Sequence, residues 1–109
     1  MEAYLPGEVV LVSFPFSDTT ETRRRPALVL LDTGDDDILV ARVTSQAGRD
    51  QFDIVLVQWR EAGLLLPSIV RVHKLATLEK GIVQRRLGTL TNDDWNRVRH
   101  AAERLWATV

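Results

Sequence analysis

The sequence contains no cysteine, and this absence excludes several classes of protein. A chain without thiols forms neither a disulfide framework nor a thiolate zinc site, and it has no cysteine nucleophile. No apolar run approaches the roughly 20 residues that a membrane-spanning helix requires, and residues 1–6 lack the basic and apolar regions of a signal peptide. We therefore expect a protein of the reducing cytoplasm that does not bind membranes.

The spacings of the common catalytic motifs are also missing. The chain has no glycine-rich phosphate loop, no H-E-x-x-H and no G-x-S-x-G, and its only histidines are His73 and His100. The acidic run at residues 35–37 follows a glycine, which is more typical of a turn than of a magnesium site. We expect neither a metal nor any other cofactor.

The sequence does contain enough apolar material for one folded domain. Of its 109 residues, 45% are hydrophobic, and the formal net charge is -1. A single domain over residues 1–109 is the prediction. Near neutrality argues against a protein that coats nucleic acid. Even so, the contiguous Arg23, Arg24 and Arg25 concentrate positive charge where a phosphodiester could bind.

Short stretches rich in β-branched residues fill most of the chain and predict strands. They lie at residues 8–16, 26–32, 38–45, 52–59, 69–73 and 82–87, with a shorter segment at 74–79. The polar residues 17–25 are predicted to form a loop, and residues 59–63 a helical turn that ends at Gly63. Pro26 is expected at the first position of its strand, where no ladder hydrogen bond is lost.

The pattern changes to helical spacing near the C-terminus. Thr91 is a predicted N-cap, with the acidic Asp94 three residues later. The apolar face of the predicted helix consists of Trp95, Val98, Ala102, Leu105 and Trp106. The predicted fold class is mainly β with a C-terminal helix, in which a strongly curved antiparallel sheet or small barrel packs against that helix.

Polar side chains at strand ends are the candidate functional residues. Pro26 restrains the backbone of Arg25 to an extended conformation, and a planar guanidinium suits phosphate oxygens. Thr44 lies near the end of a predicted strand, while Arg71 and His73 project from one face of another. Together such groups can stabilise a phosphorane-like transition state without a metal, as in a ribonuclease that uses the RNA 2′-hydroxyl as nucleophile. A solvated loop end and an ordinary strand threonine are the plain alternatives for Arg25 and Thr44.

Several segments, in order along nearly the whole chain, resemble the MazF/PemK (Kid-like) family of toxins from type II toxin-antitoxin modules. The segments that carry the resemblance are GEVVLVSFP at residues 7–15, the Arg25-Pro26 pair followed by ALVL, VTSQ at 43–46, PSIVRVHKLAT at 67–77 and GTLT at 88–91. The resemblance implies an SH3-like β-barrel and a homodimer. It also implies a metal-independent endoribonuclease that cuts single-stranded RNA, leaving a 2′,3′-cyclic phosphate and a 5′-hydroxyl. The implied partner is a cognate antitoxin with an acidic, partly disordered segment.

The resemblance also suggests roles for individual residues. The catalytic candidates that it implies are Arg25, Thr44, Arg71 and His73. The substrate-binding candidates are Arg23, Arg24, Ser45, Gln46, Thr19 and Thr20. His73 occupies a position where Kid-like members have an acidic residue. It is either a replacement acid or base, because histidine exchanges protons near neutral pH, or a silent substitution.

Other functions on the same fold stay open from the sequence. A CcdB-like inhibitor of DNA gyrase would share the barrel without cutting RNA, and an inactive relative would bind RNA without cleaving it. The pairing of Arg25 with Thr44 favours the nuclease. A generic SH3-like interaction domain would be expected to show exposed aromatic residues, whereas only 6% of this chain is aromatic.

Overall fold

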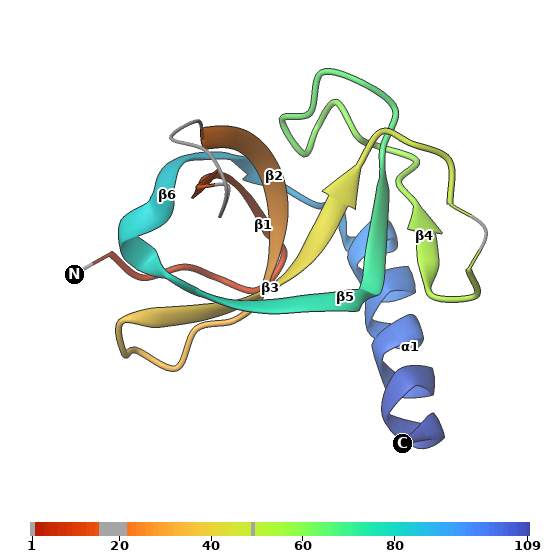
Figure 1. Cartoon of the computed structure of the whole chain (residues 1–109). Helices are drawn as coiled ribbons and strands as arrows, with labels where there is room; N and C mark the ends of the chain where they lie inside the picture. Colours follow the sequence, from red (N-terminus) through yellow and green to blue (C-terminus); the bar gives the residue numbers. More distant parts are fainter. Residues whose placement is uncertain (1, 16–21, 49) are drawn as a thin grey trace.

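The computed structural model describes residues 2–15, 22–48 and 50–109 (Figure 1). Its elements are β1 (Glu8–Pro15), β2 (Thr22–Leu31), β3 (Asp37–Thr44), β4 (Asp53–Val55), β5 (Ile69–Glu79), the short 3-10 helix η1 (Lys80–Ile82), β6 (Val83–Thr89) and α1 (Asn92–Thr108). The six described strands form one sheet in the order β4-β5-β3-β2-β1-β6, with every described pair antiparallel. The predicted fold class, mainly antiparallel β with a C-terminal helix, is confirmed. Figure 1 shows that this sheet is strongly curved. Among the described strands, no pairing joins the two edge strands, β6 and β4.

Both faces of the sheet are buried in its central part, and each face has its own core. The helix-side core contains Val9, Leu28 and Val43, and the first turns of α1 pack on it through Val98. The second core contains Val10, Val29 and other alternate residues of the same strands, and Tyr4 covers it. Because successive strand residues point to opposite faces, continuous apolar runs in β1 to β3 supply both cores at once.

The strand β5 bends sharply, as Figure 1 shows. Arg71 pairs with Arg42 of β3, but the next pair joins Leu75 to Ala41, so residues 72–74 bulge out of the ladder. The sequence predicted two separate segments, 69–73 and 74–79; this was wrong, because one bulged strand spans both. Extra residues in one strand increase its local bend and twist, which curves the sheet around the second core.

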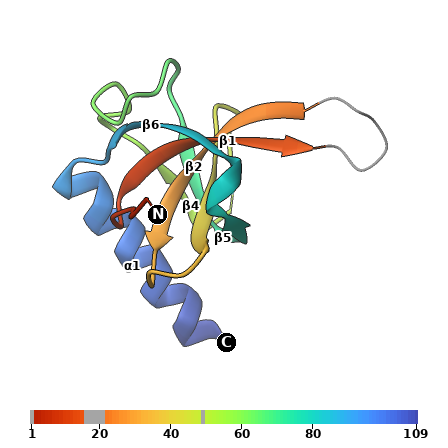
Figure 2. The same cartoon turned by 90° about the vertical axis from the view of Figure 1, so that its left-hand side faces the viewer.

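The sheet splits between β2 and β3 at Pro26. The β2–β3 pairing begins at Ala27 and Arg42, whereas residues 22–26 pair with β1 alone and project beyond the rest of the sheet (Figure 2). The prediction of a loop reaching residue 25 was therefore wrong, and Pro26 lies inside β2 rather than at its start. Proline has no N–H to donate, which fits the point where the ladder towards β3 stops.

The segment after β4 is not the strand that the sequence predicted over residues 52–59. β4 ends at Val55, because the carboxylate of Asp94 in α1 accepts the backbone N–H groups of Val57 and Gln58 at 3.1 and 2.9 Å. The chain then makes one hydrogen-bonded turn, in which the amide of Ala62 donates to the carbonyl of Gln58. The turn ends at Gly63 with φ +82°, as predicted.

The helix α1 begins after the predicted N-cap. The hydroxyl of Thr91 accepts the backbone N–H of Asp94 at 3.3 Å. Trp95 packs against the helix-side core, but Trp106, predicted for the apolar face, is 71% exposed because the last turns of α1 extend past the sheet (Figure 1). No helix in the described part of the chain is long and apolar enough to cross a bilayer.

Candidate active site

A cavity of about 390 Å³ opens where β2 and β3 separate, and we call it the Arg25 cavity. Its walls come from β1, β2, β3, β6 and the segment between β4 and β5. The lining residues are Leu11, Arg24, Arg25, Pro26, Val43, Thr44, Ser45, Gln46, Gly63, Leu64, Leu65, Leu66, Ser68, Arg85 and Leu87. Five predicted site residues therefore share one cavity: Arg24, Arg25, Thr44, Ser45 and Gln46.

The strand register explains why Arg25 and Thr44 come together. The β2–β3 ladder pairs Ala27 with Arg42, so an unbroken ladder would have paired Arg25 with Thr44. Because the strands diverge at Pro26, the two side chains line a cavity instead of forming a closed cross-strand pair. The split thus creates room for a ligand between a guanidinium and a hydroxyl.

The Thr44 hydroxyl is oriented by its own backbone. The amide of Gln46 donates to Thr44 Oγ1 at 3.2 Å, in the local turn geometry common for threonine. This bond uses one lone pair of the oxygen, so the hydroxyl proton stays available for an acceptor in the cavity. Arg25 is half-buried, which limits the positions that its guanidinium can reach.

One wall of the cavity is an apolar lip at residues 64–66. Leu65 and Leu66 are 91% and 58% exposed, while the Ser68 hydroxyl donates to the Leu66 carbonyl at 2.8 Å and holds the segment in place. The turn before the lip packs directly on β6: a Cβ added at Gly63 would collide with the Leu87 carbonyl. Glycine is required there for both the positive φ and the close approach.

The charge of the Arg25 cavity is of one sign. Arg24, Arg25 and Arg85 line it, and none of its described lining residues is an aspartate or glutamate. Within the described part of the chain, none of these three arginines forms an ion pair. A cavity with unneutralised guanidiniums, hydroxyls and an amide is suited to an anionic, hydrogen-bonding ligand.

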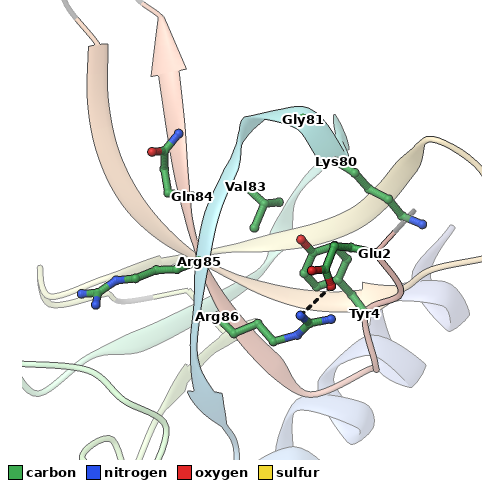
Figure 3. A pocket seen from close by; sticks show the side chains of 8 residues that line it. All are labelled: Glu2, Tyr4, Lys80, Gly81, Val83, Gln84, Arg85 and Arg86. Atoms are coloured by element: carbon green, nitrogen blue, oxygen red, sulfur yellow. Dashed lines mark hydrogen bonds and ion pairs between the residues drawn. The ribbon is translucent and has the colours of Figure 1, made fainter.

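A second pocket, around Tyr4, shares Arg85 of β6 with the Arg25 cavity but also contains an acidic residue, Glu2 (Figure 3). The Arg86 Nη1 and Nε donate to Glu2 and Glu8 at 2.8 Å each, and its guanidinium lies 4.4 Å from the centre of the Tyr4 ring. In Figure 3 Arg85 points away from this cluster, to the other side of the strand. Adjacent arginines on one strand therefore serve different surroundings, one neutralised and one not.

The structure does not bring Arg71 and His73 into the Arg25 cavity. Arg71 Nε donates to Asp53 on β4 at 3.0 Å, and His73 Nε2 lies 3.8 Å from Asp50 with its ring beside Phe52. The two do project from one face of β5, as the sequence predicted. The loop after β3 covers this face, since a Cβ at Gly48 would meet the Asp53 carboxylate.

The electrostatics of this second cluster favour a fixed ion pair. Burial raises the pKa of Asp53, but the hydrogen bond from the Asp50 amide and the Arg71 guanidinium together outweigh it, so the pKa is lowered from its ordinary value. The Nδ1 atom of His73 is buried with no hydrogen-bond partner among the described residues. Whether His73 takes part in chemistry stays a prediction.

Most of the predicted substrate-binding residues are exposed, and two lie outside the part of the chain that the structure describes. Arg23, Arg24, Ser45 and Gln46 are exposed, whereas Thr19 and Thr20 lie outside the described residues. Sequence reasoning missed Arg85 as a site residue, although alternation along VQRRLGT separates it from Arg86. It also missed the leucine lip, for which the run of three leucines before Pro67 was the available signal.

The fold and the cavity define a small β protein with a cationic cavity at a split in its sheet. The family model of the PemK-like, MazF-like toxins of type II toxin-antitoxin systems matches residues 5–105. The chain belongs to this family, as the sequence resemblance implied. A search of the curated proteins gave no match.

Solved structures of similar fold agree with this assignment. An endoribonuclease from a mycobacterial species superposes with a TM-score of 0.77 at 18% identity, covering 98% of this chain and 94% of its own. A mycobacterial endoribonuclease in complex with its cognate antitoxin gives 0.75 at 18% identity, covering 96% of both chains. A MazE-MazF structure from Deinococcus radiodurans gives 0.76 at 22% identity, covering 95% and 96%. At these identities the likeness establishes the fold.

Proposed function

We propose that the protein is a metal-independent endoribonuclease that cuts single-stranded RNA at the Arg25 cavity. The observation that carries this proposal is the cavity itself, in which a guanidinium and a hydroxyl from two diverging strands face a common space without a described carboxylate. Phosphate oxygens are the acceptors that such donors fit best. A divalent metal would need oxygen anions that the described lining does not offer.

The reaction is an attack by the RNA on its own backbone. The 2′-oxygen forms a bond to phosphorus while the bond to the 5′-oxygen breaks; one proton leaves the 2′-oxygen and one is returned to the 5′-oxygen. Arg25 and Thr44 donate to the non-bridging oxygens, which gain charge in the transition state. The products are a 2′,3′-cyclic phosphate and a 5′-hydroxyl. Arg71 and His73, which do not line this cavity, are the remaining family-based candidates.

The substrate should be an unpaired strand. In-line attack by the 2′-hydroxyl needs a backbone geometry that an A-form duplex prevents. Unstacked bases also expose their edges, and the exposed side chains of Ser45, Gln46 and Arg24 at the rim offer hydroxyl, amide and guanidinium groups to read them. These rim residues are the expected determinants of sequence choice.

The test uses purified protein and a long single-stranded RNA in the presence of EDTA. Discrete new 5′-hydroxyl ends at a recurring short sequence, with cyclic phosphate on the other fragment, are the expected result. A 2′-deoxy substitution at the mapped nucleotide should stop cleavage there. Intact RNA from a protein that arrests bacterial growth would instead favour a non-nuclease toxin of the CcdB type.

The same surface suggests the partners. We propose a homodimer and a cognate antitoxin that covers the Arg25 cavity with an acidic and apolar segment, because carboxylates compete with phosphates for guanidiniums and the leucine lip accepts apolar side chains. Sedimentation should report a dimer at micromolar concentration. A monomer under those conditions would contradict the proposed assembly.

A further inference from the structure

A second cavity of about 450 Å³, the Arg42 groove, lies on the other side of the split. It meets the Arg25 cavity at Arg25 and Pro26, the two residues that line both. Its floor contains Ala27 and Val40 of the second core, whereas the Arg25 cavity is walled by Val43 of the helix-side core. The two cavities therefore border different cores and are joined where β2 separates from β3.

The charged residues that line the Arg42 groove are also all cationic. Arg25, Arg42 and Lys74 come from the adjacent strands β2, β3 and β5, and Arg23 adds a fourth cation at one end. Neighbouring strands lie about 4.8 Å apart, so this row extends roughly 10 Å across the sheet. No described lining residue is acidic, and within the described chain Arg42 and Lys74, both exposed, form no ion pair.

This charge pattern distinguishes the two joined cavities from three others in the described part of the chain. The three other cavities that we describe each include a carboxylate: Glu2 beside Tyr4, Asp93 at the start of α1, and Asp36 beside η1. In a chain with a net charge of -1, two adjoining cavities without acidic residues form a segregated cationic path. Such a path attracts a polyanion and holds it through phosphates.

The side chains of the groove distinguish its role from that of the Arg25 cavity. Apart from its cations, the groove is lined by proline, alanine, valine and leucine, so it lacks the hydroxyl and amide groups present at Thr44, Ser45 and Gln46. Contacts to phosphates position a nucleic acid, whereas contacts to base edges select its sequence. The groove therefore has the composition of a backbone-binding surface.

We propose that the Arg42 groove binds the RNA backbone next to the scissile phosphate, with Arg42 and Lys74 as phosphate contacts. This inference rests on the proposed ribonuclease function. The RNA strand crosses β2 at Arg25, leaving one cavity and entering the other. Sequence choice is made in the Arg25 cavity, and affinity for longer RNA comes from the groove.

The test measures binding of a fully 2′-O-methylated RNA, which cannot be cut, as a function of salt. The variant is the double substitution Arg42→Gln with Lys74→Gln. The control is Arg60→Gln with Arg99→Gln, which removes the same charge from exposed residues that line neither cavity. Affinity of the first variant for a long strand should fall about tenfold, and the slope of log K against log[salt] should shrink by about 1.4, or 0.7 for each lost contact. The control should retain the wild-type slope.

Two further comparisons separate the outcomes. A trinucleotide that fills only the Arg25 cavity should bind the wild type and the double variant equally, and the sequence cut in unmodified RNA should not change. An unchanged salt slope with the long strand would overturn the inference even if the wild type cleaves RNA. Loss of binding to an acidic peptide with unchanged RNA binding would assign the groove to a protein partner and overturn it too. Failure of the wild type to cleave unmodified RNA would count against the proposed function, independently of the slope.

Discussion

Arg85 and Arg86 are neighbours on β6 and both line the pocket around Tyr4, yet of the two only Arg86 forms ion pairs within the described part of the chain. Arg86 contacts Glu2, Glu8, the carbonyl of Ala3 and the Tyr4 ring. Its guanidinium is therefore neutralised and links the N-terminal segment to the sheet. Arg85 lines a cavity whose described walls contain no acid. The comparison shows that partners decide what an arginine does: a neutralised guanidinium supports the fold, and an unneutralised one is free to hold a ligand.

The largest effect is expected on the unneutralised side. We expect expression of the wild-type protein to arrest growth and Arg25→Ala to abolish this effect, because in the proposed function the Arg25 guanidinium is the main charge that faces the phosphate. Arg99→Ala, an exposed cation of α1, is the matched control and should arrest growth like the wild type. Colony counts after induction measure both. Full toxicity of a folded Arg25→Ala protein would remove Arg25 from the site.

The wall of the cavity is expected to be the next most sensitive feature. Gly63→Ala combines positive φ with a clash against the Leu87 carbonyl, and it should lower the free energy of unfolding by about 2–4 kcal/mol. Gly34→Ala, near Asp32, has φ +97° but no atom within 4 Å, so strain alone should cost about 1–2 kcal/mol. Urea titrations measure the two values. Equal losses would show that the close packing of the turn on β6 is not a constraint.

The neighbouring arginines can be compared directly. Arg85→Gln should lower RNA affinity severalfold and reduce the salt slope by about 0.7, with no change in melting temperature. Arg86→Gln should lower the melting temperature and leave RNA affinity and the salt slope unchanged, because it removes the ion pairs with Glu2 and Glu8 and the contact with Tyr4. Filter binding and thermal melts of both variants provide the data. The comparison breaks down if Arg86→Gln weakens RNA binding as much as Arg85→Gln.

The smallest effect concerns pH and the structural side of the molecule. The amides of Tyr4 and Gly34 and the Lys80 ammonium hold the pKa of Asp32 at about 2, down from 3.8. Because the folded pKa is the lower one, the charged carboxylate stabilises the fold above about pH 4, and this contribution is lost as the pH falls towards 2. Asp32→Asn should lower stability at neutral pH and flatten its dependence over this range. Exposed Asp36→Asn is the control, and an unaltered acid profile in Asp32→Asn would refute the assignment.

Local patterns were enough to predict much of this fold. Alternating and β-branched residues located most of the strands, and Thr91 with its downstream acid located the start of α1. The errors arose where distant residues decide the structure. The sequence pattern predicted a strand at residues 56–58. Instead, the backbone N–H groups of Val57 and Gln58 donate to the carboxylate of Asp94, which lies 37 and 36 positions later in the chain. The extension of β2 before Pro26 depends on pairing with β1, which no local propensity encodes.

The candidate site was predictable only where local sequence patterns identify its residues. Arg25 and Thr44 were identified from the resemblance and from their strand-end positions, and the β2–β3 register explains their shared cavity. Arg85 was missed because β6 reaches the cavity only through its pairing with β1, more than 70 positions away in the chain. Arg71 and His73 were correctly expected on one face, but their acidic partners, Asp53 and Asp50, come from a short strand and a loop, respectively.

The most direct test of the account is single-turnover cleavage of the mapped RNA site by the wild type and four variants across neutral pH. The account predicts that Arg25→Ala and Thr44→Val each slow cleavage by about 10²–10³, the usual loss for one transition-state donor. Thr44→Ser should stay near the wild-type rate because it keeps the hydroxyl. His73→Asn should give a pH profile that superimposes on the wild type. A loss of about 10²–10⁴ in His73→Asn, with near-normal rates in Arg25→Ala and Thr44→Val, would place the chemistry at the Arg71–His73 cluster and contradict the account.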